Sequence, residues 1–332
     1  MAAFTLTKRS FLQRIFGAAC VGGLLSGAAV AQVAAPSYPN QPIRLVVPYP
    51  AGGATDTLAR TVAAKLQESW HQTVIVDNKP GASGMLGNDS VAKAPADGHT
   101  VLLGITAIVQ LPAMKAKMPY DVLKDLQPLA QVASTNSIFA VPTTTPVHSL
   151  KEFIALAKGS GGKLNYGSYG VGTSSHIQGS LLNMQAGIDL THVPYKGAAP
   201  LLQDLRGGQL SSAFIDMATA RPHVDALTVL AVTGSQRNKL LPNVPTFAEL
   251  GFQSFEPVGW FGLFMPAGVP APIAKKFAAE AQRILKLPDV VARIEGLGMT
   301  PGNLSTEEFA RVVRSDAQVY ARIIKDANIQ ID

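Results

Sequence analysis

Two glycine-rich segments of this 332-residue chain carry the residue types and spacing that suit anion binding. The first, residues 43–60, reads IRLVVPYPAGGATDTLAR. An apolar β-branched run precedes two glycines and a helix start at Thr55 or Asp56, an order that points main-chain N–H groups at an anion. Gly52 and Gly53 lack a Cβ atom, so a ligand can lie against the main chain there. An ordinary turn capped by Thr55 or Asp56 fits the same residues equally well.

The second segment, residues 164–176 (LNYGSYGVGTSSH), repeats the order of strand, glycine turn and helix. Hydroxyl side chains lie in or just after its turn, at Ser168, Thr173, Ser174 and Ser175. His176 falls in the first turn of the next helix, where we expect it to hold the turn by a hydrogen bond rather than to contact a ligand. Two such loops, roughly 115 residues apart, indicate two lobes that face each other.

Three further positions follow predicted strands. Thr106 lies just after the strand 100–103, and ligands of parallel sheets gather at the carboxyl ends of strands. Asp216 ends an apolar strand, an unusual place for a charge. It either caps the next helix or faces a cleft, where it would accept a hydrogen bond from an amine or hydroxyl. Tyr195 and Lys196 follow a proline at a strand end, and a solvated turn explains them as well.

No catalytic arrangement is found in the sequence. A nucleophile elbow needs Gly-x-Ser-x-Gly, which residues 81–84 miss by one position and Ser168 misses because Tyr166 replaces the first glycine. There is no His-Glu-x-x-His helix and no P-loop lysine. The histidines are scattered without partners at metal-ligand spacing, at His71, His99, His148, His176, His192 and His223. We therefore predict no catalytic residue, no metal and no cofactor.

Composition indicates a folded chain with a large core. Hydrophobic residues make up 47% and charged residues 15%, and the length favours two domains. Three of the six net positive charges lie in the first 31 residues, at Lys8, Arg9 and Arg14; the remainder holds 25 basic and 22 acidic residues. No basic run is interleaved with aromatic residues, so we expect no nucleic-acid partner. We expect the protein to be a monomer.

Residues 1–31 read as an export signal. Their basic residues precede an apolar stretch near 15–30, and Ala29-Val30-Ala31 fits a cleavage site. Residues 7–12 resemble a twin-arginine signal with lysine first, which leaves two export routes open. Cys20, the only cysteine, lies in the apolar stretch, where a lipid anchor is the less favoured alternative. We therefore expect a periplasmic protein without cysteine.

The periodicity of the remaining chain predicts strands alternating with helices, and hence an α/β fold with mainly parallel sheets. The expected strands are 43–47, 73–76, 100–103, 137–141, 212–215, 227–232 and 260–265. The expected helices are 56–69, one that follows the turn at 77–84 and ends near 94, 149–158, one that follows the second glycine turn and ends near 186, 199–206, 247–250, 271–287 and 305–326.

Seven segments, in order, resemble one family, the Bug-type extracytoplasmic solute-binding proteins of tripartite tricarboxylate transporters. They are VPYPAGGATDTLAR, VIVDNKPGASGMLG, AKAPADGHTVLLG, LNYGSYGVGTSSH, THVPYKGAAP, LPNVPTFAELG and WFGLFMPAGVP. The resemblance implies a periplasmic-binding-protein type II architecture, with two α/β lobes and a ligand cleft between them. Lobe 1 would comprise residues 36–139 and 256–332, and lobe 2 residues 140–255.

The resemblance also implies function and site residues. A small carboxylate (a dicarboxylate, aromatic acid or amino acid) would bind in the cleft and pass to membrane transporter subunits, without catalysis. The first loop would contribute Tyr49, Ala51, Gly52, Gly53, Ala54 and Thr55, with Asp56 as cap. The second would contribute Ser168, Gly170, Gly172, Thr173 and Ser174, with His176 in support. Asp216 is where members that bind amino acids meet the ammonium group, with Tyr195 beside it.

Two departures from the family pattern bear on the ligand. Ala51 stands where the family usually has proline, which removes a fixed φ. The loop at residues 105–110 holds fewer Ser, His and Asn residues than is usual, and this loop helps to define ligand choice. Two other outputs stay open for the same fold: a ligand sensor for a signalling system, or a hydrolase in the same cleft.

Overall fold

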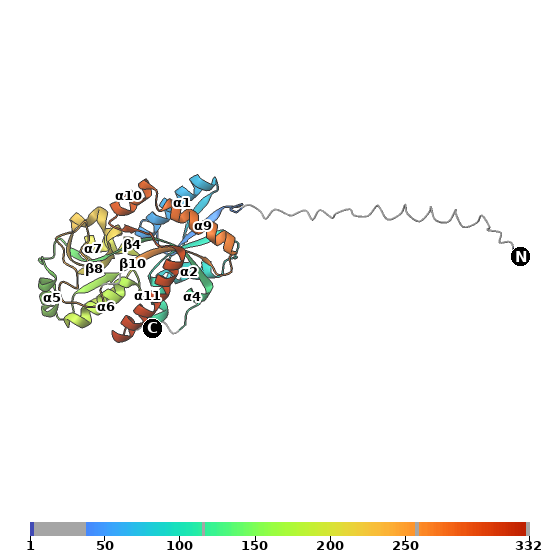
Figure 1. Ribbon diagram of the computed structural model, residues 1–332. Coiled ribbons are helices and arrows are strands. Elements are labelled where there is room, and N and C mark those ends of the chain that lie inside the picture. Colours follow the sequence, from blue (N-terminus) through green and yellow to red (C-terminus); the bar gives the residue numbers. More distant parts are fainter. Residues whose placement is uncertain (3–37, 115–116, 256–258, 330–332) are drawn as a thin grey trace. The chain divides into compact units, whose positions relative to one another are not determined.

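The computed structural model describes residues 1–2, 38–114, 117–255 and 259–329. The predicted export signal, its cleavage site and Cys20 fall on residues outside these ranges, apart from residues 1–2. The chain from Tyr38 onward forms one compact unit. In this unit two mixed sheets, each accompanied by helices, form two lobes (Figure 1).

The larger sheet has the strand order β11-β4-β10-β3-β1-β2. Its strands are β1 (Ile43–Val47), β2 (Val74–Asn78), β3 (Thr100–Ile105), β4 (Leu126–Thr135), β10 (Gly259–Pro266) and β11 (Thr300–Pro301). Strand β1 runs parallel to β2 and β3, whereas β10 is antiparallel to β3 and β4. The helices that accompany it are α1 (Ala54–Trp70), α2 (Met85–Ala92), α3 (Ala107–Met114), α4 (Val122–Asp125), α9 (Ala271–Ile284), α10 (Pro288–Gly296) and α11 (Thr306–Asp326). A short 3-10 turn, η1 (Ala82–Gly84), precedes α2.

The smaller sheet has the order β7-β6-β8-β5-β9. Its strands are β5 (Ser137–Pro142), β6 (Asn165–Ser168), β7 (Thr191–Pro194), β8 (Ser212–Asp216) and β9 (Leu227–Val232). Its helices are α5 (Leu150–Gly159), α6 (Ser174–Ala186), α7 (Ala198–Arg206), α8 (Met217–Ala220) and the 3-10 segment η2 (Arg221–Ala226). In Figure 1 this lobe, with α5, α6 and α7, lies to the left.

Apolar faces of the strands and helices explain the packing. In the larger lobe, Ile43, Leu45 and Val47 alternate on β1 and are fully buried beside α1, whose Leu58 and Val62 face the same cluster. In the smaller lobe, the stacked rings of Phe247 and Phe255 have centroids 4.1 Å apart. Aromatic pairs at this range add stability beyond their buried area. The last helix begins with a capping box, in which Ser305 and Glu308 each bond the other's main chain.

Two predictions about the elements were wrong. The sheets are mixed rather than mainly parallel, because β10 returns antiparallel between β3 and β4, and β5 runs antiparallel to both its neighbours. Residues 247–250 form a hydrogen-bonded turn, not a helix. The long strand β4 and the helix α3 were not predicted at all.

The chain passes from the larger to the smaller sheet through one residue, Asn136, between β4 and β5. The Asn136 side-chain amide donates to the Thr233 carbonyl, and the Ser137 N–H donates to Thr233 Oγ1 at 2.8 Å. These bonds tie the outgoing crossover to the returning one. We propose that the second lobe begins at β5, near residue 137 rather than 140.

Candidate functional site

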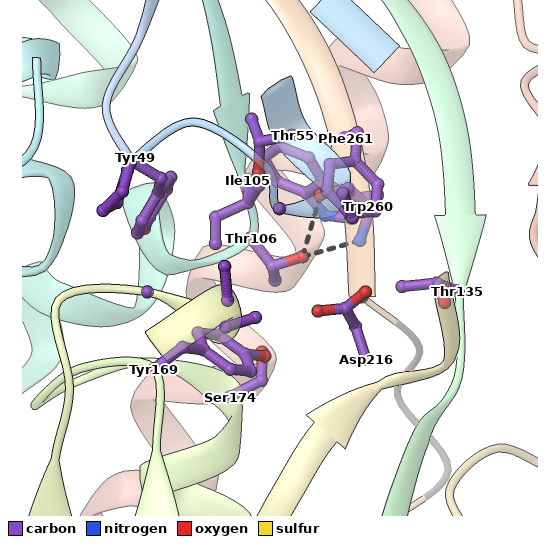
Figure 2. Close-up of a pocket in the computed structure, with 17 residues that line it drawn as sticks. Tyr49, Thr55, Ile105, Thr106, Thr135, Tyr169, Ser174, Asp216, Trp260 and Phe261 are labelled. Atoms are coloured by element: carbon purple, nitrogen blue, oxygen red, sulfur yellow. Dashed lines mark hydrogen bonds between the residues drawn. The ribbon is translucent and has the colours of Figure 1, made fainter. Parts of the chain in front are cut away.

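One cavity, partly open to solvent, lies where segments of both sheets meet. Figure 2 shows Thr106, Tyr169 and Asp216 around the same space, with side chains from the larger lobe on one side and from the smaller lobe on the other. The lining residues are Tyr49, Pro50, Gly53, Ala54, Thr55, Ile105, Thr106, Thr135, Tyr169, Ser174, Gly197, Ala198, Ala199, Asp216, Gly259, Trp260 and Phe261.

The first glycine loop, residues 49–56, delivers the start of α1 to this cavity. Gly53 is the N-cap of α1, and no side chain caps the helix. Among the described residues, the main-chain N–H groups of Thr55 and Asp56 have no protein acceptor. Unsatisfied first-turn N–H groups carry partial positive charge and suit an anion. Tyr49 also lines the cavity, but its hydroxyl donates to the Ser83 carbonyl at 3.0 Å.

Asp56 does not cap α1, contrary to one sequence-based interpretation. Its Oδ2 accepts the Gly52 N–H at 3.1 Å and the Arg60 Nε–H at 2.9 Å, while Asn78 donates to Oδ1. Burial raises the pKa of Asp56, but these hydrogen bonds outweigh burial and bring the pKa below its usual value. Asp56 therefore stabilises the shape of the loop through these hydrogen bonds and does not line the cavity. Of the other predicted loop residues, Ala51 and Gly52 do not line the cavity; they line a neighbouring groove.

The second glycine loop, residues 168–176, delivers the start of α6. Thr173 is the N-cap of α6, but its side chain accepts no hydrogen bond from the first turn of the helix. Ser174 lines the cavity. Among the described residues, the N–H groups of Ser174 and Ser175 have no protein acceptor. The predicted residues Ser168, Gly170, Gly172 and Thr173 lie outside the cavity lining. Their bonds are internal: the Thr173 hydroxyl donates to the Gly170 carbonyl at 2.6 Å, and Ser168 Oγ accepts the Gly170 N–H.

Two stacked histidines hold this second loop. His176 Nδ1 accepts the Gly172 N–H at 3.2 Å, which is the supporting role expected for it. The ring of His192 stacks on His176 at 4.3 Å and is 2.7 Å from the Ser168 hydroxyl through Nε2. Burial lowers the pKa of both histidines to about 4, and for His192 the neighbouring His176 lowers it further. Both rings are therefore neutral at neutral pH.

A third helix start, which the sequence did not reveal, also reaches the cavity. Gly197 is the N-cap of α7 without a side-chain bond, and Gly197, Ala198 and Ala199 line the cavity. Among the described residues, the N–H groups of Ala198 and Ala199 have no protein acceptor. These residues carry no polar side chain. The one sequence signal for a binding role is the glycine that follows β7 and precedes α7.

Asp216 both caps a helix and lines the cavity. It is the N-cap of α8, with Oδ1 accepting the Thr219 N–H at 2.8 Å and Oδ2 accepting the Thr219 hydroxyl at 3.0 Å, and it also lines the cavity. Burial raises the pKa of Asp216, although the bonds from Thr219 oppose that shift. Tyr195 is not beside it in the lining: the Tyr195 hydroxyl donates to Asp204 on α7 at 2.6 Å.

The larger lobe closes the cavity with apolar side chains. Ile105, Trp260 and Phe261 line it, and the Trp260 indole N–H is used by Asp316 at 2.7 Å. The Thr106 hydroxyl, in the loop predicted to lie at the cleft, accepts the Trp260 main-chain N–H at 2.8 Å (Figure 2). The sequence placed Trp260 and Phe261 in an apolar strand, and such a strand gives no sign that one face meets a ligand.

None of the described lining residues is Lys, Arg or His, and Asp216 is the only carboxyl group among them. Among the described residues, no group of three or more His, Cys, Asp or Glu side chains is placed to hold a metal ion. Positive potential in the cavity therefore comes from the three helix starts rather than from charged side chains. This arrangement can bind an anion reversibly, but it offers no nucleophile paired with a base.

Hydrogen bonds join the lobes at the cavity. Gln110 of α3 is fully buried and donates from Nε2 to Ser174 Oγ of α6 at 2.8 Å. The Ala54 N–H at the start of α1 donates to Thr219 Oγ1 at 3.2 Å, and that hydroxyl in turn donates to Asp216. The structure is therefore one in which the two lobes are bonded together beside the ligand space.

Two α/β lobes around a cavity lined by helix starts define a solute-binding protein. The chain belongs to the tripartite tricarboxylate transporter family of receptors, whose family model matches residues 58–329. This is a family of binding receptors rather than enzymes. The family predicted from the sequence motifs is thus confirmed.

Relatives agree with this assignment. Protein BugT of Bordetella pertussis is 31% identical over 94% of this chain and 98% of its own length. The solved structure of Rpa4515 from R. palustris with adipate is 31% identical, with a TM-score of 0.84 over 88% of this chain and 99% of that one. MatC from Rhodopseudomonas palustris with bound malate is 30% identical, with a TM-score of 0.81 over 86% and 100% of the two chains.

Proposed function

We propose that this protein is a periplasmic receptor that captures a small carboxylate between its lobes and delivers it to a tripartite-type membrane transporter. The observation that carries the proposal is the convergence of three helix starts, at Thr55, Ser174 and Ala198, on one cavity without a cationic side chain. Two relatives bind adipate and malate, and both ligands are small carboxylates.

Neutral donors suit a receptor that must release its load. Each helix start favours a negative group by about 0.3–1 kcal/mol, and more when partly buried. Three of them hold a carboxylate without the strong pairing that a buried arginine would give. Closing the lobes removes water and strengthens these interactions, and opening them weakens all three together.

We propose a ligand site smaller than the one inferred from the family pattern. Gly53, Thr55, Ser174 and Ala198 would donate main-chain N–H groups, and Asp216 would accept from a donor on the ligand. Tyr49, Ala54, Thr106 and Tyr169 would bound the space. The remaining predicted residues would set the shape of the loops: Ala51, Gly52, Asp56, Ser168, Gly170, Gly172, Thr173, His176 and Tyr195.

A thermal-shift screen tests the proposal with adipate, malate, benzoate, glutamate and glutamine, and with adipamide as an uncharged control. A ligand at 100 times its Kd adds about 2.7 kcal/mol to the free energy of unfolding. We expect at least one carboxylate to raise the melting temperature and adipamide to leave it unchanged. If every carboxylate behaves like adipamide, the proposed function is wrong. Loss of uptake of the stabilising carboxylate in cells that lack the gene would show transport rather than sensing.

A further inference from the structure

A second, more open groove lies on the other side of the first glycine loop. Its floor is formed by residues 51–54, two of which, Gly53 and Ala54, also line the ligand cavity. One wall comes from α10 of the larger lobe. The other comes from α7, α8 and η2 of the smaller lobe. The groove is therefore assembled by both lobes together and exists in this form only while they are joined.

The groove is basic. Arg206 of α7, His223 of η2 and Arg293 of α10 line it, all three are exposed, and no described lining residue is Asp or Glu. Among the described residues, neither arginine has a carboxylate within ion-pair distance. Asp225 and Glu295 are neighbours in the sequence but do not line the groove. We name this feature, defined by Arg206, His223, Arg293 and the floor 51–54, the basic groove.

We propose that the basic groove is the docking site for an acidic segment of the membrane partner, which recognises the joined lobes. This rests on the proposed function, because it assumes a membrane partner. Two arginines on different lobes can engage one acidic segment only when the lobes are joined, so binding reports closure. Complementary charges also guide association and select the partner. Because the segment would rest on the floor 51–54, it would touch the loop that holds the ligand.

An extended acidic segment fits the basic groove better than a small anion does. The charged side chains are exposed and come from different lobes, whereas a site for one small anion needs buried donors that converge on one point. A run of carboxylates along a chain can reach both walls. Exposed charge pairs are individually weak, about 0–1 kcal/mol each, which suits a complex that must form and separate in each transport cycle.

The test uses the full mature protein and a fluorescein-labelled decaglutamate peptide, with binding followed by fluorescence anisotropy. We expect the peptide to bind and its affinity to fall as salt rises.

The double variant R206E/R293E should weaken binding by about 10-fold or more. Arg206 and Arg293 lie in the last turns of their helices, so the matched control is K158E/K325E, which reverses two exposed charges in the last turns of α5 and α11. The control should stay within about 2-fold of the wild type. The milder variant R206Q/R293Q gives a second measurement if the charge reversal disturbs folding.

Four outcomes would overturn the proposal: no peptide binding, equal weakening by both pairs of charge reversals, unchanged binding by R206Q/R293Q, or displacement of the peptide by equimolar inorganic phosphate. The last would identify a small-anion site. The carboxylate screen is run on the same variants. If it fails while the peptide result holds, the proposed function fails alone; if the carboxylate still binds R206E/R293E while the peptide does not, the two sites are separate.

Discussion

At the scale of single residues, the loops are set by groups that do not touch the ligand space. Three polar side chains form hydrogen bonds with main-chain atoms of their own loops or with neighbouring side chains, namely those of Asp56, Ser168 and Thr173. The N–H groups that we propose as ligand donors belong to the main chain, so substituting a side chain other than by proline leaves them in place. Mutating a hydroxyl in these loops therefore tests loop geometry, and only the removal of an N–H group tests binding itself.

The His176–His192 stack should make stability depend on pH. The folded pKa of each is about 4, below the usual 6.5, so the folded protein binds fewer protons than the unfolded chain between these values. Stability is fully present above pH 6.5 and is lost as pH falls toward 4. Between pH 7 and pH 5 the loss is about 1–2 kcal/mol for the buried His176.

Chemical denaturation at pH 7 and pH 5 checks this dependence. In His176→Gln, which keeps an acceptor for the Gly172 N–H, the free energy of unfolding should fall less between the two pH values than in the wild type. His71 is exposed on α1's C-cap, so His71→Gln is the control. Parallel pH curves for the wild type and His176→Gln would contradict the assignment.

At the scale of elements, the sequence predicted those elements that have a clear apolar or glycine pattern. It missed the start of α7 and the strand β4, which have no such pattern. The strand β1, the helix α1 and both glycine loops follow from apolar periodicity and glycine spacing. The start of α7 lines the cavity with Gly197 and two alanines, which have no polar side chain that a sequence pattern could reveal. Strand β4 was missed because it pairs with β10, whose residues are more than 120 positions away in the sequence. The local sequence pattern does not predict a partner at that distance.

Ala198→Pro tests the start of α7 directly. Proline is tolerated at the first helical position, because it removes an N–H that has no helical partner, and the extended Gly197 before it (φ 156°, ψ 175°) accommodates the proline ring. Ala198→Val adds similar bulk but keeps the N–H. By calorimetry with the stabilising carboxylate, Ala198→Pro should bind about 10–100-fold more weakly than Ala198→Val, because it loses one charge-assisted hydrogen bond, worth about 1.5–3 kcal/mol. Equal affinities would show that α7 does not donate to the ligand.

The bond between α3 and α6 should stabilise the joined state. Gln110→Ala removes the donor to Ser174, and a buried hydrogen bond is worth about 0.5–1.5 kcal/mol. We therefore expect ligand affinity to fall by about 2–10-fold. Gln178 is another buried glutamine, and its Oε1 has no partner among the described residues, so Gln178→Ala is the control. If the two variants bind equally well, the Gln110 bond does not contribute to closure.

At the scale of the whole molecule, the lobes are linked by two crossovers and by hydrogen bonds across the cleft. Only Asn136 separates β4 from β5, so a change at few dihedral angles there can swing one lobe against the other. Bonds such as Ala54 to Thr219 must break in that motion. Ligand binding should therefore shift the population toward the joined lobes.

Single-molecule fluorescence measures this shift. Cys20 is the only cysteine and lies in the predicted export signal, so Glu68→Cys on α1 and Lys158→Cys on α5 can be labelled selectively in the processed protein. Energy transfer between these exposed sites should rise when the stabilising carboxylate is added. A pair within the larger lobe, Glu68→Cys with Lys275→Cys, should not change. If the interlobe pair behaves like the intralobe pair, no closure accompanies binding.

The position of β10 bears on how the polypeptide matures. The smaller sheet is made from one continuous stretch, β5 to β9, and its strand pairing can be complete once residue 232 has been synthesised or translocated. The larger sheet cannot be complete at that stage, because its inner strand β10 comes later and must enter between β3 and β4. Until then, β3 and β4 each present an unpaired edge, the kind of surface that aggregates. A chain released early would thus have a complete smaller sheet and an incomplete larger sheet with exposed strand edges. We therefore expect chaperones to act on the larger sheet.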